Sequence, residues 1–339
     1  MHFPRCTSFL RQKFDTLFPG IAICLVIAAA ANFLASHYGA PQMLFALLLG
    51  IAVHFLMEYD KCSPGIEYSS KAILRIGVAL LGFRITVDQI AGLGFETIAL
   101  VVAGVLFTIC LGALLGLATG CGTSFGVLSG GSVAICGGSA AMALSAVLPP
   151  TKTHERNTIF TVLTVTALST IAMVTYPILA SAIGLNETKA GIFLGGTIHD
   201  VAQVVGAGYS ISETTGDTAT IIKLFRVALL IPIVLTIGVL FTWYTPKSSD
   251  TKARPKPPFP WFLLGFCLFV ALNSYEIIPT FLKLQLTDLS RWCLVTAIAA
   301  LGIKTSIKSL LDTGFRPLIM VVSETLFIGA WVLFGLYLL

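Results

Sequence analysis

The sequence predicts an all-α polytopic membrane protein with about 9–11 transmembrane helices, inverted repeats and two glycine-broken segments. Composition and the order of apolar runs carry this prediction. The 339 residues are 56% hydrophobic and only 11% charged, whereas soluble domains carry about 25% charged residues. Mean hydropathy is +0.92, and no polar stretch is long enough to form a soluble domain. We therefore treat residues 1–339 as one integral membrane domain.

Continuous apolar runs are candidate membrane-spanning helices, because a span needs about 20 predominantly apolar residues. They lie at about 20–36, 41–57, 72–90, 97–119, 154–183, 219–243, 261–281, 291–310 and 316–339. Two further segments, about 123–148 and 190–209, are apolar but interrupted by glycine. Each could cross the membrane or enter and return as a hairpin, and the sequence leaves both possibilities open.

The first broken segment contains Ser129–Ala146, which reads SGGSVAICGGSAAMALSA. Irregular backbone at membrane depth is tolerated only where it is buried in protein or lines a polar cavity. The pattern favours a substrate site on a discontinuous helix, with close helix packing through small residues as the alternative. Hydroxyls, a thiol and the N–H groups of a half-helix N-terminus suit an anion. The candidate substrate-binding residues here are Ser132, Cys136, Gly137, Gly138 and Ser139.

The second broken segment contains Gly195–Gly208, which reads GGTIHDVAQVVGAG. His199 and Gln203 are four residues apart, so we expect them to share one helix face, with Asp200 beside it. Ionisable groups at membrane depth usually face a cavity or relay protons, and histidine titrates near neutral pH. We predict that His199 and Asp200 couple a proton or another ion and that Gln203 contacts substrate. The alternative is a His–Asp pair that only steadies the segment.

Two cations follow at the start of a long apolar run. Lys223 and Arg226 are three residues apart and would project from nearly the same helix face. They could bind an anionic substrate, because arginine presents a bidentate fork to oxyanions. Alternatively, they reach the membrane interface as anchors. Glu324 lies inside the last apolar run, where a buried carboxyl group could hold a proton or pair with a basic residue.

An internal repeat appears at an offset of 220 residues. ALLGFRIT at 79–86 aligns with AALGIKTS at 299–306, and Gly94-Phe95 aligns with Gly314-Phe315. The predicted copies span about 40–119 and 260–339, and they place Arg84 and Lys304 at equivalent positions. An odd number of crossings between the copies would invert one relative to the other, which is typical of secondary transporters.

Basic residues in the loops predict the orientation, because cytoplasmic loops are enriched in Lys and Arg. The N-terminus carries Arg5, Arg11 and Lys13, and loop 245–260 carries Lys247, Lys252, Arg254 and Lys256. We expect both to be cytoplasmic, in a multi-pass protein of the bacterial inner membrane. Loop 149–157 would be outside if both broken segments cross and inside if both are hairpins.

Several classes of function lack support in the sequence. The eight cysteines form no CxxC pair and no spacing typical of a zinc site. Neither GxSxG nor HExxH occurs, and no stripe of basic and aromatic residues is present. We therefore expect no enzyme activity, catalytic residue, metal, cofactor or nucleic-acid partner.

The motifs GGSVAICGGSAAMA, ERNTIF, GGTIHDVAQVVGAG and KLFRV, in this order and spacing, resemble the UPF0324 family of bacterial inner-membrane proteins. This is the YeiH-like group, often described as sulfate exporters, and the resemblance runs from about residue 15 to the end. It implies similarity to the superfamily of cation/proton antiporters and anion transporters, built on inverted repeats with crossed broken helices. The broken segments are only about 65 residues apart, so they are not simple counterparts within the repeat of 220 residues.

The expected function is secondary transport of a small inorganic or sulfonated anion, with export coupled to H⁺ or Na⁺. Sulfate, sulfite or a sulfonate is implied by the resemblance alone, and a homodimer is one assembly considered. A Na⁺/H⁺-type antiporter is the alternative within the class, although embedded carboxylates are few. A channel or a membrane-embedded sensor is the alternative of another class.

Overall fold

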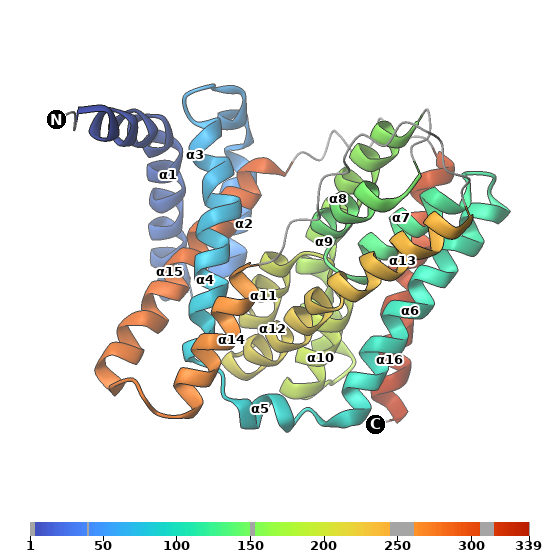
Figure 1. The fold of residues 1–339 in the computed structure, drawn as a ribbon. Helices are drawn as coiled ribbons and strands as arrows, with labels where there is room; N and C mark the ends of the chain where they lie inside the picture. Colours follow the sequence, from blue (N-terminus) through green and yellow to red (C-terminus); the bar gives the residue numbers. More distant parts are fainter. Residues whose placement is uncertain (1–3, 39–40, 150–152, 245–260, 306–314, 339) are drawn as a thin grey trace. The chain divides into compact units, whose positions relative to one another are not determined.

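The computed structural model describes residues 4–38, 41–149, 153–244, 261–305 and 315–338 (Figure 1). Regular structure in these residues is helical throughout, which confirms the all-α prediction. The chain divides into two compact units, each built from segments distant in sequence. Unit 1 contains Met1–Gln89 and Trp261–Ser306, and unit 2 contains Ile90–Pro260 and Ile307–Leu339. Loop 245–260 lies outside the described residues, and the orientation of the chain in a membrane stays a prediction.

Unit 1 holds the N-terminal helices together with the helix pair α14 and α15. Its elements are α1 (Pro4–Tyr38), α2 (Gln42–Ala52), the 3-10 turn η1 (His54–Glu58), α3 (Ser63–Tyr68), the π-helical turn η2 (Ser69–Ile73), α4 (Leu74–Leu80), the 3-10 turn η3 (Leu81–Phe83), α14 (Trp261–Ser274) and α15 (Thr280–Lys304). α5 (Val87–Ala91) lies where the chain passes from unit 1 to unit 2. The run predicted at 291–310 thus begins earlier, at Thr280, and 72–90 lies in a helix interrupted by π and 3-10 turns.

Two close helix contacts in unit 1 correspond to each other through the repeat. A Cβ added to Gly302 would lie 2.9 Å from the Cα of Gly50, and one added to Gly82 would lie 3.0 Å from the nitrogen of Val270. Adding 220 to 82 and subtracting 220 from 270 converts the second pair into the first. This exchange is what a two-fold relation between the copies requires, while inversion across a membrane stays a prediction.

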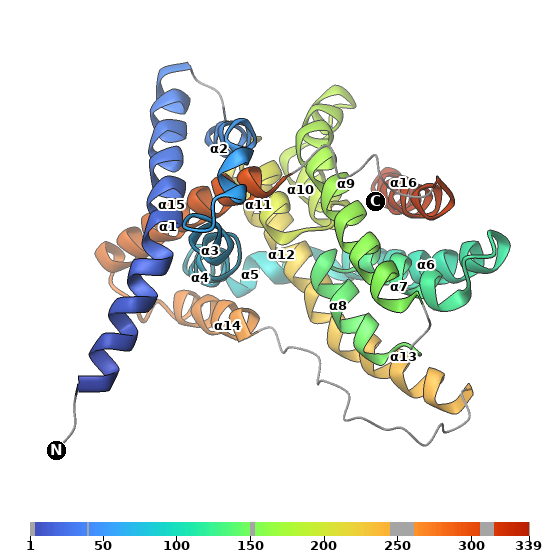
Figure 2. The same ribbon diagram turned by 90° about the horizontal axis from the view of Figure 1, so that it is seen from above.

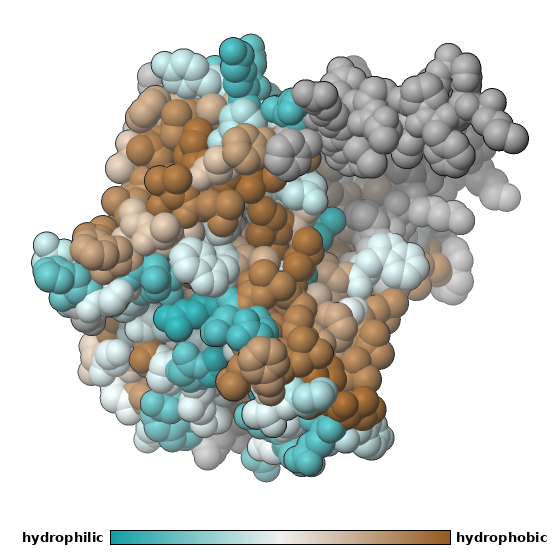
Figure 3. Space-filling model, turned by 90° about the vertical axis from the view of Figure 1, so that its left-hand side faces the viewer, coloured by the Kyte–Doolittle hydropathy of each residue, from teal (hydrophilic) through white to brown (hydrophobic). Residues whose placement is uncertain are grey.

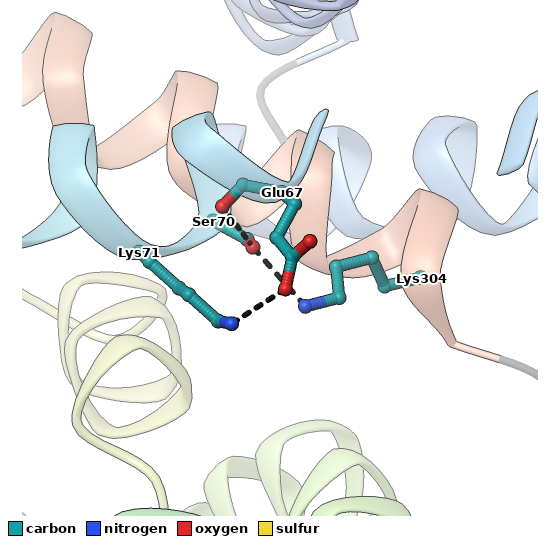
Figure 4. A network of polar contacts seen from close by, with 4 residues as sticks. All are labelled: Glu67, Ser70, Lys71 and Lys304. Carbon is teal, nitrogen blue, oxygen red and sulfur yellow. Dashed lines mark hydrogen bonds and ion pairs between the residues drawn. The ribbon is translucent and has the colours of Figure 1, made fainter. Parts of the chain in front are cut away.

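A small polar network lies where α3 and η2 meet the end of α15, also in unit 1 (Figure 4). The Lys304 ammonium donates to the Ser70 hydroxyl at 3.3 Å, and Lys71 pairs with Glu67 at 2.5 Å. The Lys71 ammonium, as hydrogen-bond donor and as charge, lowers the pKa of the Glu67 carboxyl group below its ordinary value. Lys304 is thereby tied to a neighbouring helix and does not extend freely from the end of α15.

Unit 2 contains the two glycine-broken segments and the helices that surround them (Figure 2). Its elements are α6 (Gly94–Ala118), α7 (Thr123–Ala134), α8 (Gly138–Val147), α9 (His154–Ala182), α10 (Glu187–Thr197), α11 (Val201–Tyr209), α12 (Glu213–Ala228), α13 (Leu230–Tyr244) and α16 (Phe315–Leu338). Each broken segment is thus a pair of half-helices: α7 with α8, and α10 with α11.

The repeat-equivalent helices α6 and α16 pack antiparallel in unit 2. The Thr119 hydroxyl lies 3.0 Å from the sulfur of Met320, whereas the Trp331 indole donates to the carbonyl oxygen of Leu100 at 3.0 Å. Residue numbers therefore fall along one helix as they rise along the other. Antiparallel packing is the relation that an inverted repeat predicts for equivalent helices.

Both broken segments fold back on themselves as helical hairpins. α10 runs parallel to α12, because Gly191 contacts Thr218 and Gly195 contacts Ala219, whereas α11 leads directly back into α12. In the other segment, Gly131 of α7 contacts Leu144 of α8. We call α7–α8 the first hairpin and α10–α11 the second hairpin. The resemblance implied crossed broken helices, and these contacts describe folded-back pairs.

Six helices of the described residues are long and apolar enough to cross a membrane. They are Asp15–Tyr38, Gly94–Ala118, His154–Ala182, Glu213–Phe241, Thr280–Lys304 and Arg316–Leu338, and shorter apolar helices lie at Gln42–Ala52, Gly138–Val147 and Trp261–Ser274. Broad areas of one face are hydrophobic (brown in Figure 3), and large apolar side chains such as Val26, Phe33 and Leu268 are exposed. An apolar exterior is favourable against lipid and unfavourable in water.

Candidate functional site

The tips of the two hairpins are held together by two cations from α12. The Lys223 ammonium donates to the carbonyl oxygens of Ile135 at 2.6 Å and of Ile198 at 2.9 Å. Lys223 thus bonds to the end of α7 and to the end of α10 simultaneously. Its side chain is fully buried, so it does not extend to an interface as an anchor.

Arg226 makes the same connection with more donors. Its Nε and Nη2 donate to the carbonyl oxygens of Ala134 and Val133, at 2.8 and 2.9 Å. Its Nη1 donates to those of Gly195 and Ile198, at 2.9 and 3.1 Å. Carbonyl oxygens at a helix C-terminus carry partial negative charge. The two cations therefore neutralise the C-terminal ends of α7 and α10.

The first hairpin turns at a glycine in a left-handed conformation. Gly137 has φ +62° and ψ −123°, a region that residues with a Cβ rarely adopt. Its N–H donates to the carbonyl oxygen of Ser132 at 2.8 Å and closes the end of α7. The pair Gly130-Gly131 lies within α7, where Gly130 packs against the backbone of Thr108 on α6.

The second hairpin turns at extended residues. Ile198 and Asp200 have φ −61° and −96° with ψ 140°, and the pair Gly195-Gly196 lies inside α10. The Ser169 hydroxyl of α9 accepts from the backbone N–H groups of His199 and Asp200, at 3.2 and 3.0 Å. The glycines that marked this segment in the sequence therefore serve close helix packing.

The two half-helices that leave the tips differ at their N-termini. α11 is capped by the Asp200 carboxylate, which accepts from the N–H of Ala202 at 2.9 Å. α8 has no side-chain cap. The N–H groups of Gly138, Ser139 and Ala140 show no hydrogen bond to another residue in the part of the chain that the structure describes. Gly138 is half-buried and Ser139 is exposed, so this N-terminus is accessible.

His199 lies in the turn between α10 and α11, so it does not share a helix face with Gln203 as expected. Its ring is fully buried, with Nδ1 3.1 Å from the carbonyl oxygen of Val133 and Nε2 3.1 Å from the Thr325 hydroxyl. A carbonyl oxygen can only accept, so Nδ1 carries the proton in this contact. The ring links the end of α7 to α16.

The remaining predicted residues occupy different environments around the tips. The Ser132 hydroxyl donates to Leu128 of its own helix at 2.5 Å, and Cys136 is buried in the turn. The Gln203 amide nitrogen donates to the Thr170 hydroxyl at 2.8 Å, whereas its oxygen Oε1 has no partner among the described residues. Of this predicted set, Gly138 and Ser139 are the most accessible at the first tip.

Several polar residues that hold the tips were not singled out in the sequence. Ser169, Thr170 and Thr325 belong to α9 and α16, far from either broken segment in sequence. Ser169-Thr170 and Glu324-Thr325 are adjacent polar pairs inside apolar helices. A search for such pairs would have found them, since polar groups at membrane depth need partners.

The charges at the tips favour an anion. Lys223 and Arg226 supply two positive charges and Asp200 supplies one negative charge, which leaves an excess of one positive charge. The C-terminal helix ends are neutralised by the cations and α11 by Asp200, so the N-terminus of α8 is the end without a charged partner among the described residues. Free N–H groups at a helix N-terminus, with the positive end of the helix dipole, bind anions.

Comparison with known proteins places the whole chain in one family. The model of the family "Conserved hypothetical protein 698" matches residues 19–321. A UPF0324 membrane protein of Chlorobaculum tepidum is 52% identical over 322 residues, which cover 95% of this chain and 89% of the relative. The UPF0324 membrane protein TauZ of Paracoccus denitrificans is 47% identical over 331 residues, 97% of each chain. No solved structure matches. By these matches, the chain belongs to the UPF0324 family of membrane proteins.

Proposed function

We propose that this membrane protein is a secondary active transporter of a small anion, and that the anion binds at the N-terminus of α8. One observation carries the proposal: among the four half-helix ends at the hairpin tips, this one has accessible N–H groups and no cap. Discontinuous helices that point their N-termini at an anionic group are typical of secondary transporters. Residues Gly137, Gly138 and Ser139 form the proposed contact surface.

Lys223 and Arg226 act on the anion through their charge in this proposal. Most of their donors are engaged by backbone carbonyl oxygens, so an anion that took those donors would have to displace structural contacts. The excess positive charge at the tips lowers the cost of moving an anion to membrane depth. Sulfate, sulfite or a sulfonate, exported with H⁺ or Na⁺ coupling, is the substrate class that the family resemblance suggests.

The direct test is flux through proteoliposomes that contain the purified protein. Labelled sulfate, sulfite and a taurine-like sulfonate are offered separately, with and without imposed pH and Na⁺ gradients. We expect saturable, gradient-dependent flux of at least one anion, and protein-free liposomes measure leakage. Flux of none of these anions under any gradient rejects the proposal, and non-saturating flux that is independent of both gradients favours a channel.

A variant pair tests the place of binding. Ser139→Asp puts a carboxylate in the first turn of α8, where it satisfies the helix dipole and repels the substrate. We expect the KM for the anion to rise at least about tenfold, because a unit charge at contact distance contributes several kcal/mol. Ser139→Asn has similar size without the charge and should keep the KM near that of the parent protein. Equal KM values for the two variants would move the site elsewhere.

A further inference from the structure

Glu324 is a buried carboxyl group without a cationic partner. It lies inside α16, within the candidate membrane span Arg316–Leu338, and its side chain is 0% exposed. Its Oε1 accepts a hydrogen bond from the Ser129 hydroxyl at 2.7 Å. Its Oε2 has no hydrogen-bond partner among the described residues. One oxygen of a fully buried carboxyl group is thus unsatisfied, in a molecule whose buried cations are bonded to carbonyl oxygens.

The space around this carboxyl group is maintained by glycine. A Cβ added to Gly112 of α6 would lie 2.8 Å from Glu324 Oε1 and 2.4 Å from the carbonyl oxygen of Gly126 on α7. α6, α7 and α16 therefore meet at this point at a separation that excludes any side chain at position 112. The junction accommodates the carboxyl group and the Ser129 hydroxyl of α7, and its packing is specific to them.

The helices packed against α16 supply no neutralising charge at this junction. These helices are α6, α7, α9 and α10. Their titratable groups are Glu96 and Cys110 on α6, His154, Glu155, Arg156 and Tyr176 on α9, and Glu187 and Lys189 on α10, with none on α7. α16 itself carries Arg316 and Tyr337 near its ends.

The nearest of these groups have other contacts. The Lys189 ammonium donates to the carbonyl oxygen of Leu336 at 3.0 Å, and the Tyr176 hydroxyl lies beside Gly329. His199 reaches α16 at Thr325, the residue after Glu324. None of them forms a hydrogen bond or ion pair with Glu324 in the described part of the chain.

An ionised carboxylate in this position would be a buried charge with one hydroxyl donor, which costs several kcal/mol. Protonation at Oε2 removes the charge and retains the bond from Ser129 to Oε1. We propose that Glu324 is the proton-binding group of the transporter, with Ser129 as its hydrogen-bond partner. The group carries its proton while the α6–α7–α16 junction is closed and releases it to water when the junction opens.

This inference rests on the proposed transport function for its role but has its own readout. Infrared difference spectra of the purified protein between acidic and alkaline pH would show a carboxylic acid C=O band that titrates. We expect Glu324→Gln to lose this band and Ser129→Ala to shift its frequency, because one hydrogen bond to the carboxyl group is removed. Glu96→Gln removes an exposed carboxylate from α6 and serves as the matched control.

A band that persists unchanged in Glu324→Gln overturns the assignment. A band whose loss is driven by added Na⁺ at constant pH assigns the site to a sodium ion and also overturns it. Glu324→Asp keeps a carboxyl group and should retain a shifted band, so it replaces the amide variant if that variant does not fold.

Flux measurements then assign the role in coupling. In proteoliposomes, Glu324→Gln should lose accumulation driven by a pH gradient and retain exchange of labelled for unlabelled anion, whereas Glu96→Gln should keep both. Accumulation in Glu324→Gln that equals the parent's overturns the coupling role. If the parent protein moves no anion, the proposed function fails, while the infrared spectra still decide whether Glu324 binds a proton.

Discussion

The two hairpins meet tip to tip, yet they are built differently. The first hairpin turns through a left-handed glycine, Gly137, and its outgoing helix α8 has no side-chain cap. The second hairpin turns through extended residues and its outgoing helix α11 is capped by Asp200. The C-terminal ends of both incoming helices are held by Lys223 and Arg226. The comparison teaches that the cations fix both hairpins, whereas the uncapped N-terminus makes only the first one available to an anion.

The largest expected effect comes from removing what the hairpins share. Arg226→Leu eliminates four hydrogen bonds to carbonyl oxygens of both tips. Hydrogen bonds to charged groups contribute about 1.5–3 kcal/mol each, so the loss approaches the whole folding stability of about 5–15 kcal/mol. We expect aggregated or undetectable protein by size-exclusion chromatography, with the exposed Arg316→Leu as control. A monodisperse Arg226→Leu protein with the parent's Tm would contradict the structural role.

A smaller effect is expected from the turn that only the first hairpin uses. Gly137→Ala forces a Cβ into a left-handed conformation and places it 3.3 Å from a methyl group of Val165. The left-handed region costs about 1–2 kcal/mol for residues with a Cβ. We expect a Tm lowered by a few degrees.

Gly138→Ala is the matched control for that change. Gly138 has no positive φ, and a Cβ there would make an ordinary contact with Val162 at 3.4 Å. The Tm of this variant should stay close to the parent's. If both alanine variants unfold at the same temperature, the turn does not depend on the left-handed glycine.

The smallest effect concerns the cap that only the second hairpin has. Asp200→Asn keeps an oxygen that can accept from the N–H of Ala202 and removes the negative charge near the tips. We expect the apparent affinity for the anion to rise by a factor of a few, because one repulsive charge is lost. Tm should change little, since Asn and Asp cap helices about equally. Glu187→Gln at the start of α10 controls for charge removal, and a lower affinity in Asp200→Asn would show that the carboxylate assists binding.

Local rules predicted the positions of the breaks to within a few residues. The glycine pair Gly137-Gly138 marks the first turn because its first member must adopt a positive φ. The pair Gly195-Gly196 marks the second turn only approximately, since both glycines lie in α10 and the turn follows at Ile198–Asp200. A glycine in a sequence has the same appearance whether it provides a turn or a close helix contact, and only the neighbouring helix distinguishes them.

The roles of the charged residues depended on tertiary contacts. Lys223 and Arg226 were correctly placed on one helix face, but the sequence could not show that backbone carbonyl oxygens of two other segments occupy that face. Ser129 and Glu324 are 195 residues apart, and their hydrogen bond exists because α7 and α16 pack together. A buried polar group acquires its partner from packing, so its function cannot be derived from its own segment.

The sequence by itself determined the all-helical architecture, the two broken segments and the set of polar residues at membrane depth. Apolar length, glycine position and charge are local properties, and each acts through the bilayer or the backbone alone. Only the tertiary structure decided that the broken segments fold back, that the cations bind carbonyl oxygens and that Glu324 lies unpaired beside Ser129. These features depend on which helices approach one another, because hydrogen-bond partners distant in sequence are brought together by packing alone.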